Sequence, residues 1–476
     1  MIKRNIKRTA AFLTAILSVS GAAGCGSSSK TSSGEDVSQV ETVVVNDTSE
    51  IDAIPEGAET EIRWMGTYDL NPAKGKDKSV EMSLFNNKGG TVVWDQVIDS
   101  QKFDKLAAAI MSKQNVPDIF KYEWLAFPCQ VVKDMYQPVD SIVSFDDPLW
   151  ADTKETADQF EMAGEHYVAP ISFEPTTFMM YDYDLIQSEG LDDPYELYKN
   201  GEWNWNNWVD IIDTFCSNAT GDDIRYGVNG WFNTQIIQQT GKTMINYDKA
   251  NNQFTSNLND PDIERAENML YDLAKNGYIL NEWTGSASAT LKGGNVLFYV
   301  MGTWAMTGNA GPKDGDDWRI VPMPSDPNTD EKYMSSAMTA YMWVKGSTKK
   351  EAVKTWYECC RMAATSDEYK ENGKEKFLNA NPHWTEEMYQ VIVDASSTDY
   401  KQIFDYGYGI SGTLSDDNSN EDGSCVTRKL YEYTNNTDDS GHRYTWAELR
   451  ETWGPTVESE LKTINAAISS YIASKE

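Results

Sequence analysis

The segment SQKFDKLAAAIMSKQNVPDIF, residues 100–120, contains a helix pattern followed directly by a strand pattern. Its apolar side chains recur at the i, i+3, i+4, i+7 and i+8 positions of one helix face, namely Phe103, Leu106, Ala107, Ile110 and Met111. Residues Val116–Phe120 then lead into a strand. Strands are also expected at Ile62–Met65 and Val80–Phe85. This region therefore predicts a βαβ unit, whose ligand-facing side is the carboxyl end of its strands.

The same alternation of apolar strands and amphipathic helices continues beyond this unit. Asp260 and Pro261 form a helix start and Gly277 a helix stop. Further helices are expected at about 349–362 and Pro455–Ala473, and an acidic, Asn-rich loop at 415–424. The pattern predicts an α/β fold with mostly parallel sheets.

Composition excludes several classes of function. The 476 residues include 41 Lys plus Arg against 74 Asp plus Glu, a net charge of −33 that excludes nucleic acid as a partner. Aromatic residues make up 12% of the chain, with 16 Trp and 25 Tyr, which is typical of a folded protein with aromatic surface to spare. The three His and six Cys form no CxxC or HExxH motif, so we expect no metal, no cofactor and no Cys–His catalysis.

The N-terminus has the pattern of a secretory signal. Four basic residues precede an apolar stretch at 10–19, and Gly21–Gly24 leads to Cys25. A Cys after small residues resembles the lipobox of bacterial lipoproteins, although Ala22 stands where Leu is usual. We expect a signal peptide at 1–24, lipidation of Cys25 and a flexible tether at 25–56. The protein would then be extracytoplasmic and held to the membrane through this lipid only; a soluble secreted protein is the alternative.

A series of short motifs runs in order over roughly residues 60 to 360. They are the helix and strand of 105–119, Gln137–Asp140, Tyr167–Pro170, Met180–Ile186, Gly201–Trp205, Gly302–Ala305 and Val321–Pro324. Together they resemble the extracellular solute-binding proteins of family 1, the class that includes maltose-binding protein and serves sugar ABC importers. Asp182 stands where this family usually has Asn, and Asn204 where it has Thr.

The resemblance implies a periplasmic-binding-protein-like fold, with two α/β lobes joined by crossing strands and the ligand between them. One lobe is expected at 57–170 and 330–380, and the other at 171–329 and 381–476. The crossings would fall near Ile171–Phe178 and Met323–Met334. We expect a monomer.

Aromatic and polar residues that follow the expected strands are candidates for ligand contact. A pyranose has apolar faces and a rim of hydroxyls, so a sugar site needs flat aromatic rings together with carboxylates and amides. The candidates are Trp64, Tyr68, Tyr122, Glu123, Trp124, Glu174, Asp182, Trp231, Asn233, Trp304 and Tyr408. The resemblance supports 122–124, Glu174, Trp231 and Trp304, whose positions match places where the family contacts sugar.

For each candidate a structural role competes with the functional one. Most Trp side chains in proteins are core residues, and Trp203, Trp205 and Trp208 at a helix start are expected to pack. Ligand contact is favoured for Trp231 and Trp304, whereas Trp64 and Trp124 are balanced between the two roles. Glu174 could equally form a hinge salt bridge.

The function implied is a lipoprotein that captures a carbohydrate, with an oligosaccharide favoured, and delivers it to the permease of an ABC importer without chemistry. The alternative is a secreted glycoside hydrolase, which needs two carboxylates at one sugar site. Glu123 and Glu174 could be given those roles, but no sequence feature selects them. A calcium-binding adhesin, suggested by Asn418–Gly423, fails because Lys429 stands where a bidentate Glu is required.

Overall fold

The computed structural model describes residues 50–74, 76, 78–175, 177–415 and 425–475. The expected signal peptide at 1–24, Cys25, residues 25–49 of the expected tether and all but Ser415 of the acidic loop lie outside these residues. The tether bounds of 25–56 are wrong at their end, because Ile51 and Ile54 are buried in the core. Within the described part of the chain, no helix has the length and apolar character that crossing a bilayer requires.

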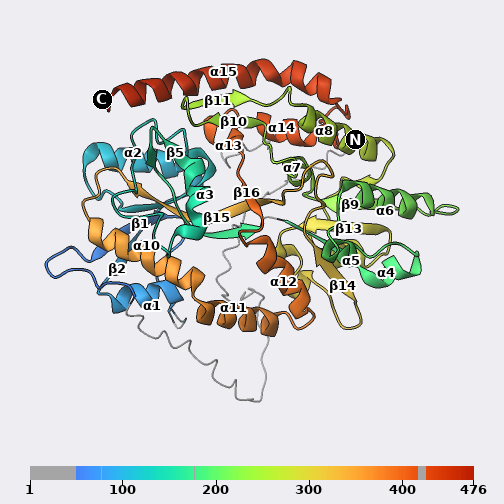
Figure 1. Cartoon of the computed structure of the whole chain (residues 1–476), viewed down its shortest axis with the longest axis horizontal. Coiled ribbons are helices and arrows are strands. Elements are labelled where there is room, and N and C mark those ends of the chain that lie inside the picture. The colour runs from blue at the N-terminus through green and yellow to red at the C-terminus, as the bar shows by residue number, and fades with distance from the viewer. Residues whose placement is uncertain (1–49, 75, 77, 176, 416–424, 476) are drawn as a thin grey trace, which may run out of the picture.

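The larger sheet has seven strands and lies on the left of Figure 1. Its order is β16-β15-β3-β1-β2, and β4 and β7 also pair with β15. Strand β1 lies between β3 and β2 and is parallel to both. The strands are β1 (Glu61–Gly66), β2 (Thr91–Gln96), β3 (Ile119–Lys121), β4 (Tyr136–Gln137), β7 (Ala169–Pro175), β15 (Tyr333–Val344) and β16 (Lys401–Ile403).

The smaller sheet has five strands in the order β12-β9-β13-β8-β14 and lies on the right of Figure 1. Strands β12, β9 and β13 are parallel, and β8 and β14 are antiparallel to their neighbours. The strands are β8 (Phe178–Asp182), β9 (Tyr226–Gly230), β12 (Ile279–Leu280), β13 (Val296–Met301) and β14 (Trp318–Val321). Two hairpins stand apart from both sheets: β5 (Glu161–Met162) with β6 (Glu165–His166), and β10 (Ile245–Asp248) with β11 (Gln253–Ser256).

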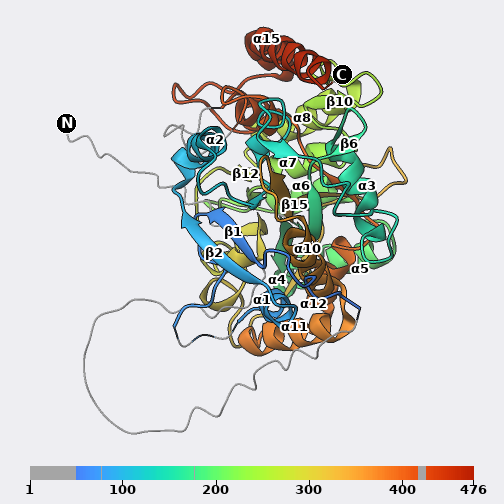
Figure 2. The same ribbon diagram turned by 90° about the vertical axis from the view of Figure 1, so that its left-hand side faces the viewer.

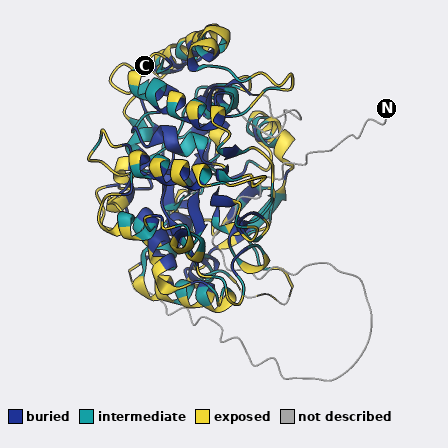
Figure 3. Cartoon of the chain, turned by 90° about the vertical axis from the view of Figure 1, so that its right-hand side faces the viewer, coloured by how far each residue is buried: buried dark blue, intermediate teal, exposed yellow. Residues whose placement is uncertain are grey.

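Helices pack beside both sheets, which buries the strands inside the molecule (Figures 2 and 3). Those near the larger sheet are α1 (Val80–Asn87), α2 (Lys102–Ser112), α3 (Lys154–Ala157) and α10 (Lys350–Thr365). Those near the smaller sheet are α4 (Tyr183–Ser188), α5 (Pro194–Lys199), α6 (Trp205–Ser217), α7 (Asn233–Gln238), α8 (Pro261–Lys275) and α9 (Ala287–Leu291). The remaining helices are α11 (Asp367–Ala380), α12 (Glu386–Ala395), α13 (Gly407–Ile410), α14 (Val426–Glu432) and α15 (Trp446–Ala473).

The last helix, α15, lies across the top of both halves in Figure 1. It packs against α8 and β11, while Tyr471 bonds Tyr167 at 3.0 Å between the two hydroxyl oxygens. Lys475, just past its end, pairs with Glu165 at 2.6 Å. The C-terminal segment therefore contacts elements on both sides of the molecule.

Three predicted helices are confirmed: the one after Ser100 is α2, the one that starts at Asp260 and Pro261 is α8, and the one expected at about 349–362 is α10. In α8, Asp260 accepts a hydrogen bond from the Asp262 amide and Pro261 takes the first helical position. Gly277 follows its end with a φ of +77°, the left-handed conformation that favours glycine. In this helix, capping residues and apolar spacing agree, so the sequence alone determines it.

Two predictions of secondary structure are wrong. Val80–Phe85 forms part of helix α1, because Ser79 caps it and Met82 and Phe85 bury one helical face; a short apolar run fits either structure. The C-terminal helix begins at Trp446, nine residues before Pro455, with a capping box between Thr445 and Glu448. Pro455 lies inside this helix, although proline more often marks a helix start.

Two connections join the sheets, at the places where the sequence predicts crossings. The chain leaves the larger sheet at the end of β7 and enters the smaller one at β8, and it returns between β14 and β15. The fold is thus two α/β lobes with a hinge of crossing strands. Strand β15 pairs with β3 as far as Lys121, the carboxyl end of β3, and its pairing with β7 extends past that point. Strand β8, which follows β7 in the chain, starts in the smaller sheet beside Met301, the carboxyl end of β13. The carboxyl edges of both sheets therefore lie at the crossing.

Candidate functional site

Three tryptophans follow the three parallel strands of the smaller sheet. Trp231 comes directly after β9, Trp283 follows β12, and Trp304 lies in the short 3₁₀ turn Thr303–Ala305 after β13. Parallel strands end at one edge of a sheet, so these side chains gather there. Gly230 makes the first position possible: its φ is +107°, and a Cβ would lie 1.9 Å from the carbonyl oxygen of Val300.

The three indoles form one exposed cluster, which we call the indole cluster. The Trp231 ring centroid lies 6.0 Å from that of Trp283 and 6.0 Å from that of Trp304, and the last two are 6.3 Å apart. Their exposed fractions are 38%, 59% and 43% for Trp231, Trp283 and Trp304. Trp203, Trp205 and Trp208 are buried, as their helical setting predicts. Exposed aromatic surface concentrated in one place is typical of a binding site.

Aromatic and acidic residues also follow the strands of the larger sheet. Tyr68 comes after β1, and Tyr122, Glu123 and Trp124 come after β3. Trp124 stacks on Tyr408 of α13, with centroids 4.4 Å apart and planes at 27°. Helix α13 approaches closely because Gly409 lacks a Cβ, which would lie 2.0 Å from the carbonyl oxygen of Phe127. Tyr122 is half-buried, with its ring centroid 5.0 Å from that of Phe160.

Glu174 lies near the end of β7, on the crossing itself. Its Oε1 accepts a hydrogen bond from Thr339 Oγ1 at 2.9 Å. Burial raises the pKa of Glu174, although this bond and the charge of Lys121 oppose the shift. Burial likewise lowers the pKa of Lys121. The carboxyl group and the ammonium are thus held in a poorly solvated place, where a polar ligand would meet fixed hydrogen-bonding groups.

Glu123 pairs with Lys102, whose ammonium donates to Oε2 of the carboxylate. Asn233 opens α7 two residues after Trp231, and its Oδ1 accepts from the Thr234 amide at 3.1 Å. Tyr68 is half-buried against Trp64, with centroids 5.7 Å apart. The two edges together offer aromatic faces, carboxylates, an amide and ammonium groups, which are the groups that bind a neutral polar molecule with apolar faces.

Two of the expected site residues take structural roles. Trp64 is 1% exposed and donates its indole N–H to the Tyr68 carbonyl at 2.9 Å, so its ring has no free face. Asp182 caps α4 by accepting from the Asp184 amide at 3.0 Å. It stands at the end of β8, beside the amino end of β13, and therefore at the sheet edge opposite Trp231 and Trp304. We leave both residues out of the candidate site.

Sequence reasoning missed several residues that the structure brings to these edges. Trp283 follows a two-residue strand, too short for a pattern of alternation, although the helix stop at Gly277 marked the start of this connection. Lys121 and Thr339 become neighbours of Glu174 only through the pairing of β15 with β3 and β7. Pairings between segments this far apart leave no signal in a single sequence. In the part of the chain that the structure describes, the one group of side chains placed to hold a metal ion lies elsewhere, at the β5–β6 hairpin.

The family model described as bacterial extracellular solute-binding protein matches residues 72–361, more than half of the chain. No curated protein matches the sequence.

Solved structures of sugar-binding proteins share the fold. The sugar-binding protein MalE from Xanthomonas citri has 15% sequence identity and a TM-score of 0.56, covering 88% of this chain and 100% of that one. The galacto-N-biose-/lacto-N-biose I-binding protein of the ABC transporter from Bifidobacterium longum has 11% identity and a TM-score of 0.57, covering 86% and 99%. The cyclic α-maltosyl-1,6-maltose binding protein from Arthrobacter globiformis has 14% identity and a TM-score of 0.53, covering 86% and 98%. At these identities the likeness concerns the fold.

Proposed function

The chain belongs to the bacterial extracellular solute-binding proteins, and from this we propose that it captures a carbohydrate between its two lobes and delivers it to an ABC importer. The similar structures named above are those of sugar-binding proteins, including one that belongs to an ABC transporter. Their ligands differ, so they support the class of ligand and leave its identity open. We favour an oligosaccharide because the aromatic surface extends over several rings.

The observation that carries this proposal is the indole cluster. The apolar C–H faces of a pyranose stack on aromatic rings, while its hydroxyls need hydrogen-bond partners. Three indoles about 6 Å apart present more aromatic surface than one sugar ring covers. A site of this shape favours two or more linked sugar units.

Polar groups, most of them at the carboxyl edge of the larger sheet, would form hydrogen bonds with the hydroxyls of the sugar. Glu174, Glu123 and Lys121 supply charged acceptors and donors, and Asn233 supplies an amide near Trp231. A buried hydroxyl without a partner costs about 1–3 kcal/mol, so these groups would select ligands whose hydroxyls match them. Tyr68, Tyr122, Trp124 and Tyr408 complete the proposed contact set from the larger sheet's side.

Binding would draw the lobes together. Open and closed arrangements exchange about the crossing strands, and a ligand that contacts both edges only in the closed arrangement shifts the population toward it. We propose lobes at 57–170 with 330–380 and at 171–329 with 381–476, except that β16 (Lys401–Ile403) pairs with β15 and so belongs to the larger sheet. The permease would recognise the closed shape, and the protein would act as a monomer that performs no chemistry.

We further propose that Cys25 carries a lipid and that the tether, expected at 25–56, ends before Ile51 and Ile54, which are buried in the core beside the larger sheet. The basic segment, apolar stretch and small residues before Cys25 support this proposal. The protein would stand outside the cytoplasmic membrane, held by the lipid, near the permease that it supplies.

The test is a screen of the purified protein against a panel of glycans. A bound glycan raises the melting temperature, and chromatography after incubation recovers the same glycan intact. The hydrolase alternative has no support from the family, whose members bind solutes. Appearance of shortened products would nevertheless overturn the proposal, as would a panel in which no glycan binds.

A further inference from the structure

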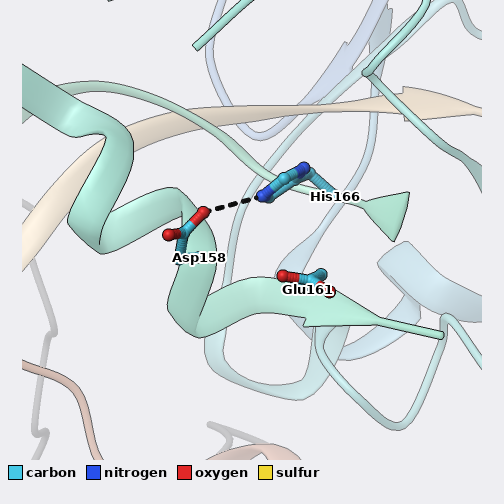
Figure 4. A group of neighbouring side chains, drawn as sticks. All are labelled: Asp158, Glu161 and His166. Atoms are coloured by element: carbon cyan, nitrogen blue, oxygen red, sulfur yellow. Dashed lines mark hydrogen bonds and ion pairs between the residues drawn. The ribbon is translucent and has the colours of Figure 1, made fainter. Parts of the chain in front are cut away.

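A second cluster of ligating side chains lies at the β5–β6 hairpin (Figure 4). Asp158 lies in the 3₁₀ turn Asp158–Phe160 that precedes the hairpin, Glu161 begins β5, and His166 ends β6. One potential ligand atom from each residue lies within 4.8 Å of the others. All three side chains are partly exposed. His166 precedes the amino end of β7, whereas Glu174 lies near its carboxyl end, so this cluster is separate from the candidate sugar site.

The imidazole of His166 is held in one orientation. Its Nδ1 lies 2.7 Å from Asp140 Oδ1, and the same carboxylate accepts from the His166 amide at 2.8 Å. Its Nε2 faces Asp158 Oδ1 at 3.0 Å. Both nitrogens lie at hydrogen-bonding distance from carboxylates, so the protonated imidazole donates to Asp140 and to Asp158. A metal ion would take the place of the Nε2 proton, while Nδ1 goes on donating to Asp140. A carboxylate behind a histidine in this way is the usual support for a metal-binding imidazole.

The ammonium group of Lys249 contacts two residues of this cluster. Lys249 Nζ lies 3.0 Å from Glu161 Oε2 and donates to the Asp158 carbonyl oxygen at 3.2 Å. Lys249 belongs to the turn of the β10–β11 hairpin, where Asn252 Oδ1 accepts from the Ala163 amide at 2.8 Å. The lysine therefore joins one hairpin to the other through the same carboxylate that a metal ion would use.

We propose that Asp158, Glu161 and His166 bind a divalent transition-metal ion of the zinc class, which displaces the ammonium of Lys249 from Glu161. One imidazole nitrogen and two carboxylate oxygens suit Zn²⁺ or Mn²⁺, with water completing the coordination, whereas Ca²⁺ and Mg²⁺ prefer oxygen ligands alone. Metal binding and the Lys249 contact exclude each other at Glu161. The ion would thus loosen one of the contacts between the two hairpins.

This competition predicts that removing a positive charge strengthens binding of a positive ion. Isothermal titration of Zn²⁺ into the protein, after treatment with a chelator, should reveal a site that His166→Ala and Asp158→Asn each weaken at least tenfold. Lys249→Gln should tighten the same site severalfold, because Glu161 no longer has a competing partner. Lys249 is partly exposed, so this variant leaves the core intact. His442→Ala is the matched control, since His442 also lies beside a carboxylate, 3.9 Å from Glu448, but in no such cluster.

Three outcomes would overturn the proposal. One is the absence of detectable zinc binding at about 1 mM metal, which would mean that the binding free energy is weaker than about 4 kcal/mol. Another is zinc binding that His166→Ala leaves unchanged. The third is a Lys249→Gln variant that binds zinc no more tightly than the natural protein. If His166→Ala lowers the melting temperature strongly, Glu161→Gln replaces it and should show the same weakening.

Discussion

Replacing Trp283 by alanine should weaken glycan binding and leave the fold intact. Its side chain is 59% exposed, so truncation opens no buried cavity. The ring contacts that the chain loses are those with Trp231 and Trp304, at centroid distances of 6.0 and 6.3 Å. Each such pair contributes about 0.5–1.5 kcal/mol, so the loss of two pairs should lower the free energy of unfolding by at most about 1–3 kcal/mol.

The effect on binding follows from the stack that the sugar loses. A loss of about 1.4 kcal/mol corresponds to a tenfold rise in Kd, and this is the expected size for one aromatic face. Isothermal titration with the glycan that most raises the melting temperature measures it. Trp231→Ala and Trp304→Ala should change the Kd in the same direction. Because the three rings touch one another, the triple variant will not equal the sum of the singles.

Ile224→Ala is the matched control for these variants. Ile224 is 65% exposed but precedes the amino end of β9, so it lies at the sheet edge opposite Trp231. Its removal should leave the Kd unchanged. If all three Trp variants keep the natural affinity, or if Ile224→Ala weakens binding as much as they do, the indole cluster does not bind the glycan.

Four other substitutions test separate parts of the account. Glu174→Gln should raise the glycan Kd about tenfold in titration calorimetry, because a charged hydrogen-bonding group contributes about 1.5–3 kcal/mol, and an unchanged Kd would exclude it from the site. Trp208→Ala, in contrast, should lower the free energy of unfolding in urea by about 3–5 kcal/mol because the ring is fully buried, and a loss below about 1 kcal/mol would contradict that packing. Burial raises the pKa of Asp405 to about 6, above its value in the unfolded chain, so its protonated form stabilises the fold below about pH 4 and this stabilisation is lost as the pH rises through 6. Between about pH 4 and 6, the free energy of unfolding in urea should therefore fall for the natural protein relative to Asp405→Asn. The same pH dependence in both proteins would contradict the raised pKa of Asp405. Cys25→Ser should release the protein from the membrane fraction of expressing bacteria, and retention of the variant would count against the lipid anchor.

The fold could be predicted from local patterns because several elements carry redundant signals. In α8, the cap at Asp260, the proline at 261, the buried face and the stop at Gly277 all agree. Prediction failed where one signal stood alone: the apolar run at Val80–Phe85 fits a strand or a helix, and only its packing selects the helix. At Pro455, the general preference of proline for helix starts misplaced the start of α15, whose capping box at Thr445 lies ten residues before the expected start.

The candidate site could be predicted in part, for a similar reason. Trp231 and Trp304 follow strands long enough to recognise, so their place at the carboxyl edge is readable from the sequence. The sequence left the role of Trp64 open between ligand contact and core, because its burial depends on Tyr68 and Tyr341 packing against its ring. Trp283 joins the cluster through a strand pairing that no local pattern reveals.

Small-angle X-ray scattering with and without the bound glycan measures whether the two lobes close. If two lobes close over an intact carbohydrate, the radius of gyration falls when the glycan saturates the protein. An unchanged radius of gyration at full saturation would contradict closure about the crossing strands.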